Sequence, residues 1–173
     1  MNNLRVKALI ECSVFAAVIA VLSLISIPLP LGVPVTLQIF SVSLAGYFLG
    51  PKKGVAATSV YLAVGLMGLP VFAGFQGGFQ VLLGPTGGFL AGFVLLAFFT
   101  GIASKFEKQI KAFLIGLIGL ALCHILGTAQ YSFYSLLSFY KAFLIVSAPY
   151  LIKDVLLLYL ALFVSGKIKK KLI

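Results

Sequence analysis

Charged side chains are scarce in this sequence: Asp, Glu, Lys and Arg make up 9% of its 173 residues. A soluble globular domain carries about 25% charged residues, so this chain has too few to cover a water-facing surface. Hydrophobic residues make up 62% of the chain, and the mean hydropathy is +1.20. We therefore predict an all-α integral membrane protein whose apolar side chains face lipid as well as one another.

Acids and metal-ligating side chains are rarer still, with three acids, one histidine and two cysteines. Cys12 and Cys123 each lie within an apolar run, which favours two packed thiols over a disulfide or a metal pair. A single histidine excludes a multi-histidine metal site, so we predict no bound metal ion. We interpret His124 as a packed or hydrogen-bonded residue of a helix.

Nucleotide-binding and hydrolase motifs are absent from the sequence: there is no G-x-x-x-x-G-K-[ST] loop, no H-E-x-x-H and no G-x-S-x-G. If the chain helps to concentrate a solute, the energy must come from a partner or an ion gradient. The net charge of +10 does not indicate nucleic-acid binding, because the basic residues form short clusters between apolar runs.

Six apolar segments are separated by breakers and charges. A helix crosses the hydrocarbon core with about 20 residues, so the chain has room for about six spans in a single transmembrane domain, residues 1–173. The expected spans are residues 8–27, 35–49, 55–67, 85–104, 112–131 and 148–166.

The basic residues predict how these spans are oriented. Eleven of the thirteen lie at the termini and in the two–three and four–five links, which share one side of the membrane if there are six spans. The positive-inside rule makes that side the cytoplasm. Both termini are therefore expected to be cytoplasmic.

Two links on the other side, residues 28–34 and 69–84, contain no charge and are rich in Gly, Pro, Phe and Gln. Irregular backbone at membrane depth is tolerated where protein buries it or where it lines a cavity. We expect these links to fold back over a cavity on the outer side. Candidate lining residues are Thr36, Gln38, Gln76, Gln80 and Thr86, with Phe72, Phe75, Phe79 and Tyr150 as apolar walls.

Asp154 is the strongest candidate for a functional residue, because it lies inside the otherwise apolar last span, beside Lys153. An ionisable residue at such a depth costs about 2.5–3.5 kcal/mol, which favours a ligand-binding role over a purely structural ion pair. Consecutive helical residues point about 100° apart, so Lys153 and Asp154 are not expected to face each other. Glu11 is expected to pair with Lys7, and Glu107 to be solvated.

Small residues recur four apart in two spans, as Ala16 and Ala20 in the first and as Gly84, Gly88 and Gly92 in the fourth. This spacing allows close helix contact. It serves either packing within the chain or docking to another membrane protein, and the spacing alone does not distinguish these two roles.

Five segments, in order over residues 8–166, carry a family resemblance. They are Val33-Pro-Val-Thr36-Leu-Gln38-Ile-Phe40, Leu49-Gly-Pro-Lys52-Lys-Gly54, Gly68-Leu-Pro70-Val-Phe72, Leu83-Gly-Pro-Thr86-Gly-Gly-Phe89 and Pro149-Tyr-Leu-Ile-Lys153-Asp154. Together they resemble the BioY family, the biotin-specific substrate-binding (S) components of energy-coupling factor (ECF) transporters. The resemblance implies the ECF S-component fold, a place in the prokaryotic cell membrane, and high-affinity biotin uptake without enzyme activity.

Members of that family associate with a transmembrane coupling (T) subunit that carries two ATP-binding cassette ATPases. The resemblance implies these partners here, with Ala16 and Ala20 matching the family's Ala-x-x-x-Ala docking motif. It implies no cofactor, since biotin is the bound substrate.

The chemistry of biotin fits the candidate residues. Its ureido ring offers two N–H donors that a carboxylate such as Asp154 accepts, and its carboxylate needs a cation or amide donors, for which Lys153, Gln76 and Gln80 are candidates. Its compact apolar body suits glycine backbone and aromatic rings. The predicted substrate-binding set is Thr36, Gln38, Gln76, Phe79, Gln80, Gly84, Thr86, Gly88, Tyr150, Lys153 and Asp154.

Three other functions stay open. The chain fits an S component for another vitamin, an intramembrane enzyme that uses Asp154 as an acid–base group, or a channel lined by Lys153 and Asp154. Binding measurements with a vitamin panel test the first function. The chemical state of the recovered ligand tests the second, and conductance tests the third.

Overall fold

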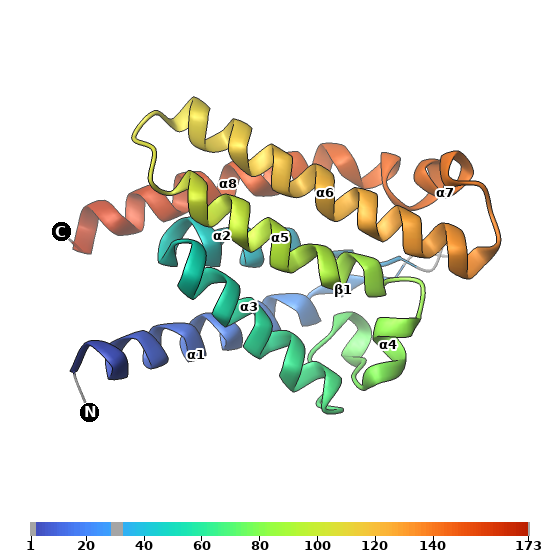
Figure 1. Cartoon of the computed structure of the whole chain (residues 1–173), viewed down its shortest axis with the longest axis horizontal. Coiled ribbons are helices and arrows are strands. Elements are labelled where there is room, and N and C mark those ends of the chain that lie inside the picture. The colour runs from blue at the N-terminus through green and yellow to red at the C-terminus, as the bar shows by residue number, and fades with distance from the viewer. Residues whose placement is uncertain (1–2, 29–32, 173) are drawn as a thin grey trace.

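The apolar segments fold into a bundle of helices in the computed structural model, which describes residues 3–28 and 33–172 (Figure 1). The helices are α1 (Asn3–Leu24), α2 (Gln38–Leu49), α3 (Pro51–Leu66), α4 (Phe79–Leu83), α5 (Gly87–Ala103), α6 (Gln109–Ser135), α7 (Phe139–Val146) and α8 (Ala148–Leu172). Strands β1 (Ser26–Ile27) and β2 (Val35–Thr36) pair antiparallel, and η1 (Ala73–Phe75) is a 3₁₀ turn. Residues 29–32 of the predicted link 28–34 lie outside the described residues.

Each of the six predicted spans contains one principal helix: α1, α2, α3, α5, α6 and α8. Within the described part of the chain, α1 and α6 are long and apolar enough to cross a membrane by themselves. Helices α7 and α8 are bent by 53° at the break between them and add a third such segment only if the pair forms one span. Helices α2 and α5 are apolar but have 12 and 17 residues, fewer than the roughly 20 of a straight span. Six crossings therefore stay a prediction.

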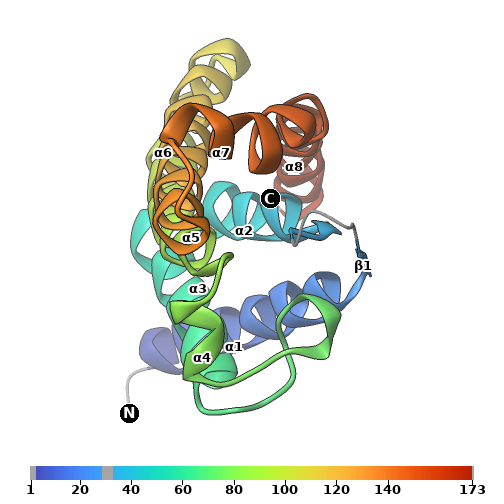
Figure 2. The same cartoon turned by 90° about the vertical axis from the view of Figure 1, so that its right-hand side faces the viewer.

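The basic segments gather at one end of the bundle. Helix α1 begins there and α8 ends there, and the α2–α3 turn and the α5–α6 link lie at the same end (Figure 1). The hairpin of β1 and β2, α4 and α7 lie towards the opposite end (Figure 2). The basic segments therefore lie together at one end of the molecule, as the charge pattern predicted. Which end faces the cytoplasm stays a prediction.

The glycine spacing in α5 serves packing within the chain. A Cβ at Gly88 would lie 2.2 Å from the carbonyl oxygen of Leu126, and one at Gly92 would lie 2.7 Å from the Cα of Cys123. Only residues without a side chain allow α5 and α6 to approach so closely. Cys12 and Cys123 are free thiols, as predicted.

Helix α1 packs its small residues against the bundle. Ala16 is buried in the core and Ala20 is half-buried against it, while Ala17 lies on the exposed face. Docking of a T subunit at Ala16 and Ala20 stays a prediction. Glu11 pairs with Lys53 of α3, with Oε2 and Nζ 2.6 Å apart, and not with Lys7. The expected pairing of Glu11 with Lys7 is thus wrong, because α1 packs against α3, a neighbour that local spacing does not reveal.

Candidate binding site

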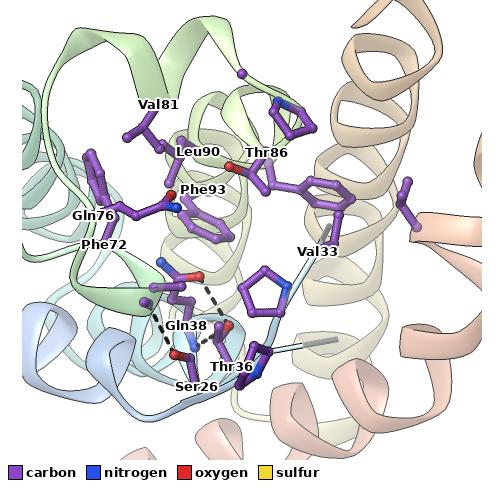
Figure 3. A pocket seen from close by; sticks show the side chains of 18 of the residues that line it. Ser26, Val33, Thr36, Gln38, Phe72, Gln76, Val81, Thr86, Leu90 and Phe93 are labelled. Carbon is purple, nitrogen blue, oxygen red and sulfur yellow. Dashed lines mark hydrogen bonds between the residues drawn. The ribbon is translucent and has the colours of Figure 1, made fainter. Parts of the chain in front are cut away.

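A cavity of about 930 Å³ lies among the β1–β2 hairpin, the link between α3 and α5, and helices α5 to α8 (Figure 3). Its size falls within the range of about 300–1,000 Å³ that is common for small-molecule sites. Apolar side chains form much of its wall: Leu24, Val33, Phe72, Val81, Phe89, Leu90 and Phe93.

The link between α3 and α5 forms one wall because its backbone is pinned to α3. Phe72 is 2% exposed, and its ring meets that of Tyr61 edge-on with centroids 5.5 Å apart. The N–H of Gly78, a residue with φ of +94°, donates to the carbonyl oxygen of Gly65 at 2.7 Å. The prediction that this link folds back over a cavity is confirmed. Its location on the outer side of the membrane stays a prediction.

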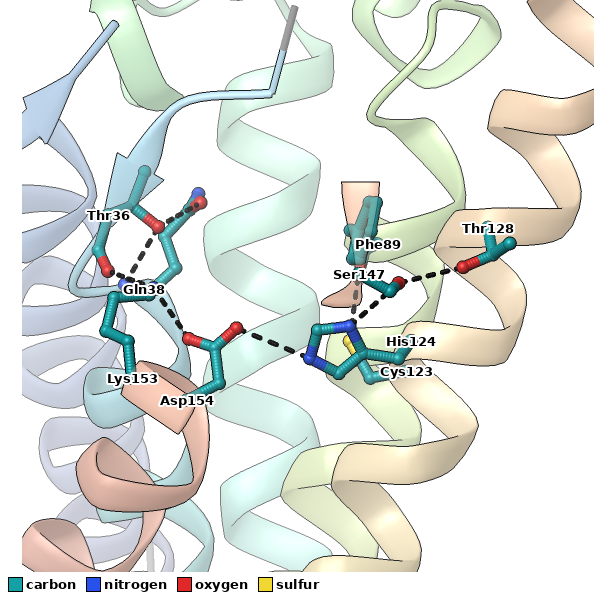
Figure 4. A network of polar contacts seen from close by, with 9 residues as sticks. All are labelled: Thr36, Gln38, Phe89, Cys123, His124, Thr128, Ser147, Lys153 and Asp154. Atoms are coloured by element: carbon teal, nitrogen blue, oxygen red, sulfur yellow. Dashed lines mark hydrogen bonds and ion pairs between the residues drawn. The ribbon is translucent and has the colours of Figure 1, made fainter. Parts of the chain in front are cut away.

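Asp154 brings a buried negative charge to the cavity. Its side chain is 6% exposed, with Oδ1 2.6 Å from Nζ of Lys153 and Oδ2 3.3 Å from Nε2 of His124 (Figure 4). Lys153 also donates to the carbonyl oxygen of Thr36 at 3.2 Å. Lys153 and Asp154 therefore do face each other, contrary to the expectation from helical spacing, because the flexible lysine stem bends back along α8.

His124 connects this ion pair to a second polar group. Its Nδ1 lies 3.0 Å from Oγ of Ser147, which lies 2.8 Å from Oγ1 of Thr128. The ring is buried and meets Phe89 edge-on. Its interpretation as a hydrogen-bonded helix residue is confirmed, but its place beside Asp154 was missed, since nothing in the spacing of α6 and α8 brings the two positions together.

The polar groups on β2 and at the start of α2 bind one another. Oγ1 of Thr36 donates to Oε1 of Gln38 at 3.1 Å, and Nε2 of Gln38 donates to the hydroxyl of Tyr61 at 2.9 Å. The hydroxyl of Tyr150 donates to the carbonyl oxygen of Val33. These bonds fix the wall beside Lys153.

Most of the predicted set lines the cavity: Thr36, Gln38, Gln76, Gln80, Gly84, Thr86, Tyr150, Lys153 and Asp154. Phe79 and Gly88 lie elsewhere, because Phe79 is 58% exposed and Gly88 packs against α6. Lining residues outside the predicted set include His124, Phe89, Phe93 and Tyr134. Contact of any of these side chains with a ligand stays a prediction.

Known proteins match the chain over nearly its whole length. The model of the BioY family matches residues 1–173. The biotin transporter BioY of Thermotoga maritima is 41% identical over 165 residues, which cover 95% of this chain and 96% of that protein. The probable biotin transporter BioY of Pyrococcus horikoshii is 34% identical over 152 residues, covering 88% and 90%. A crystal structure at 2.1 Å of the S-component for biotin from an ECF-type ABC transporter matches with a TM-score of 0.88 and 28% identity, covering 98% of this chain and 94% of that one.

Proposed function

The chain belongs to the BioY family, and we propose on that premise that it binds biotin as the substrate-binding component of an ECF-type transporter and serves biotin uptake. The chain is a multi-pass protein of the prokaryotic cell membrane. Residues 1–173 act as one domain, and biotin is the transported substrate and not a cofactor.

The observation that carries this proposal is the buried carboxylate of Asp154 on the wall of the cavity. A buried charge is costly unless it is paired and hydrogen-bonded. Asp154 has ion-pair contacts with Lys153 and His124, but its Oδ1 has no hydrogen-bond partner among the described residues, and a ligand with N–H donors supplies one. The ureido N–H groups of biotin are such donors. Lys153 has three N–H donors, of which contacts with Asp154 and Thr36 use two, so a third serves the ureido carbonyl oxygen.

The rest of the cavity suits the other parts of biotin. Phe72, Phe89 and Phe93 give apolar surface for the bicyclic body. Gln76 comes from the link between α3 and α5, and its amide points into the cavity (Figure 3). An amide N–H at this position is a donor for the carboxylate of biotin.

Energy for uptake comes from partners in this proposal. The sequence has no phosphate-binding loop, so a T subunit with two ATP-binding cassette ATPases supplies ATP hydrolysis. The chain performs no chemistry on its ligand, which leaves the cavity unaltered.

Equilibrium binding of labelled biotin to the purified full-length protein tests the proposal. Asp154→Asn is expected to weaken binding about tenfold or more, because hydrogen bonds to a charged group contribute about 1.5–3 kcal/mol. The matched control is Glu107→Gln, which removes the same charge from an exposed position in the α5–α6 link and is expected to bind as wild type. Unchanged binding by Asp154→Asn rejects the role of Asp154.

Two further measurements address the other functions. Calorimetry with a vitamin panel identifies an S component of different specificity if another vitamin binds and biotin does not. Mass spectrometry of the ligand recovered after incubation shows a changed mass if the cavity is an enzyme site. Wild-type protein that binds biotin and returns it unchanged is the expected result.

A further inference from the structure

The corner between α7 and α8 is tied to α6 by buried polar side chains. Ser147 caps the C-terminal end of α7, directly before α8 begins, and its Oγ contacts both Nδ1 of His124 and Oγ1 of Thr128. Ser147 and Thr128 are fully buried and His124 is 4% exposed. The same ring reaches Asp154 with its other nitrogen (Figure 4). One imidazole thus joins the helix corner to the carboxylate.

The two ring nitrogens of His124 differ in their contacts. Nδ1 forms a hydrogen bond with Oγ of Ser147, which also contacts Oγ1 of Thr128. Nε2 lies 3.3 Å from Oδ2 of Asp154, within ion-pair distance, but forms no hydrogen bond among the described residues. The ring is thus held at one nitrogen, and its other nitrogen lies beside the carboxylate.

The two partners of the carboxylate differ in how well they hold it. Lys153 reaches Oδ1 with a long stem, and its side chain is 29% exposed towards the cavity. His124 reaches Oδ2 from a ring that is 5% exposed and held at its other nitrogen. The carboxylate therefore has one partly exposed partner on a long side chain and one buried partner, and the buried ring limits how the carboxylate can turn.

We propose that His124 is a positioning residue for ligand binding: its ring, held at Nδ1 by Ser147, places Nε2 3.3 Å from Oδ2 of Asp154 and limits the orientations of the carboxylate before the ureido donors of biotin arrive. The inference rests on the proposed function, because it assigns to Asp154 the role of accepting those donors. His124 acts through Asp154 and supplies no bond to the ligand. Preorganisation of this kind raises affinity by removing the cost of ordering the site during binding.

Two substitutions at His124 distinguish the roles of its two ring nitrogens. A glutamine amide extends about as far as Nε2, so His124→Gln keeps a donor for Asp154 and loses the contact with Ser147. An asparagine amide extends about as far as Nδ1, so His124→Asn keeps the contact with Ser147 and loses the donor. We expect His124→Asn to weaken biotin binding about tenfold and His124→Gln to stay within about threefold of wild type.

The opposite order of affinities overturns the proposal, since it means that the tie to the α7–α8 corner is what binding requires. Equal loss in both variants, or no loss in either, also overturns it. Thermal unfolding without biotin accompanies each measurement. Loss of affinity in His124→Asn at an unchanged midpoint supports positioning, and loss that merely follows a lowered midpoint contradicts it.

A double variant distinguishes positioning from direct contact with biotin. In the Asp154→Asn background, His124→Asn is expected to cause little further loss, because the group that it positions is no longer a carboxylate. A further loss of the same size as in wild type means that the ring contacts the ligand itself and overturns the proposal. Wild-type protein that does not bind biotin would instead reject the proposed function, whatever the His124 variants do.

Discussion

The ring of Phe72 occupies the space that Gly65 leaves open on α3. A Cβ at Gly65 would lie 2.2 Å from Cζ of Phe72, and the ring is almost wholly buried. Phe72 belongs to the link that forms one wall of the cavity. The packing of Phe72 against α3 therefore holds this wall of the cavity in place.

Substitution Gly65→Ala is expected to push Phe72 out of its place. Overpacking of a core costs about 1–3 kcal/mol, so the midpoint of thermal unfolding in detergent should fall, and biotin affinity should fall with it as the wall moves. The control is Gly166→Ala in α8, where an added Cβ meets nothing within 4 Å. Unchanged unfolding and binding in Gly65→Ala would show that Phe72 does not anchor the wall.

The long elements of this fold were predictable, and the short ones were not. The predicted span 85–104 corresponds to α5 (Gly87–Ala103), because a Gly-Pro breaker and a charged link enclose it. Helices α4 and α7 have five and eight residues, too few to stand out as periodic segments within a link. Their positions depend on packing against helices that are distant in the sequence.

The candidate site, like the fold, was predictable only in part. Asp154 was predictable because a charge inside an apolar span needs a partner. The contact with His124 was not predictable, since two single residues on separate helices leave no pattern in the sequence. The bend of Lys153 towards its neighbour was also missed, because helical spacing describes Cβ directions and not the reach of a long side chain.

Lys153→Met is expected to weaken binding of biotin and of biotinamide, a ligand with a neutral tail, by the same factor of about ten. The reason is that Nζ lies 2.6 Å from Oδ1 of Asp154, so both side chains serve the ureido end of the ligand. Lys141→Met, at an exposed position of α7, is the matched control. A loss that appears with biotin and vanishes with biotinamide would place Lys153 at the carboxylate instead.

Gln76→Glu is expected to weaken binding of biotin and to leave binding of biotinamide unchanged. A second negative charge about 4 Å from the carboxylate costs about 1–4 kcal/mol at effective dielectric constants between 80 and 20. Isothermal titration with both ligands measures the difference, and Gln109→Glu at the exposed start of α6 controls for the added charge. Equal losses with both ligands would mean that the carboxylate lies elsewhere in the cavity.

Gln130 fastens the link beside the cavity to α6. Its Nε2 donates to the carbonyl oxygens of Leu82 and Gly84 at 2.6 and 2.7 Å, both at the C-terminal end of α4. Removing such bonds costs about 0.5–1.5 kcal/mol each. Substitution of Gln130 should therefore destabilise the link and leave the contacts of the ligand with α8 unchanged.

Gln130→Ala is therefore expected to speed dissociation of biotin about tenfold and to raise amide hydrogen exchange in residues 68–86. Gln109→Ala, on the same helix at an exposed position, should change neither quantity. Faster exchange with an unchanged dissociation rate would show that biotin leaves by a route that the link does not close. An unchanged exchange rate would show that other contacts, such as that of Phe72 with α3, hold the link by themselves.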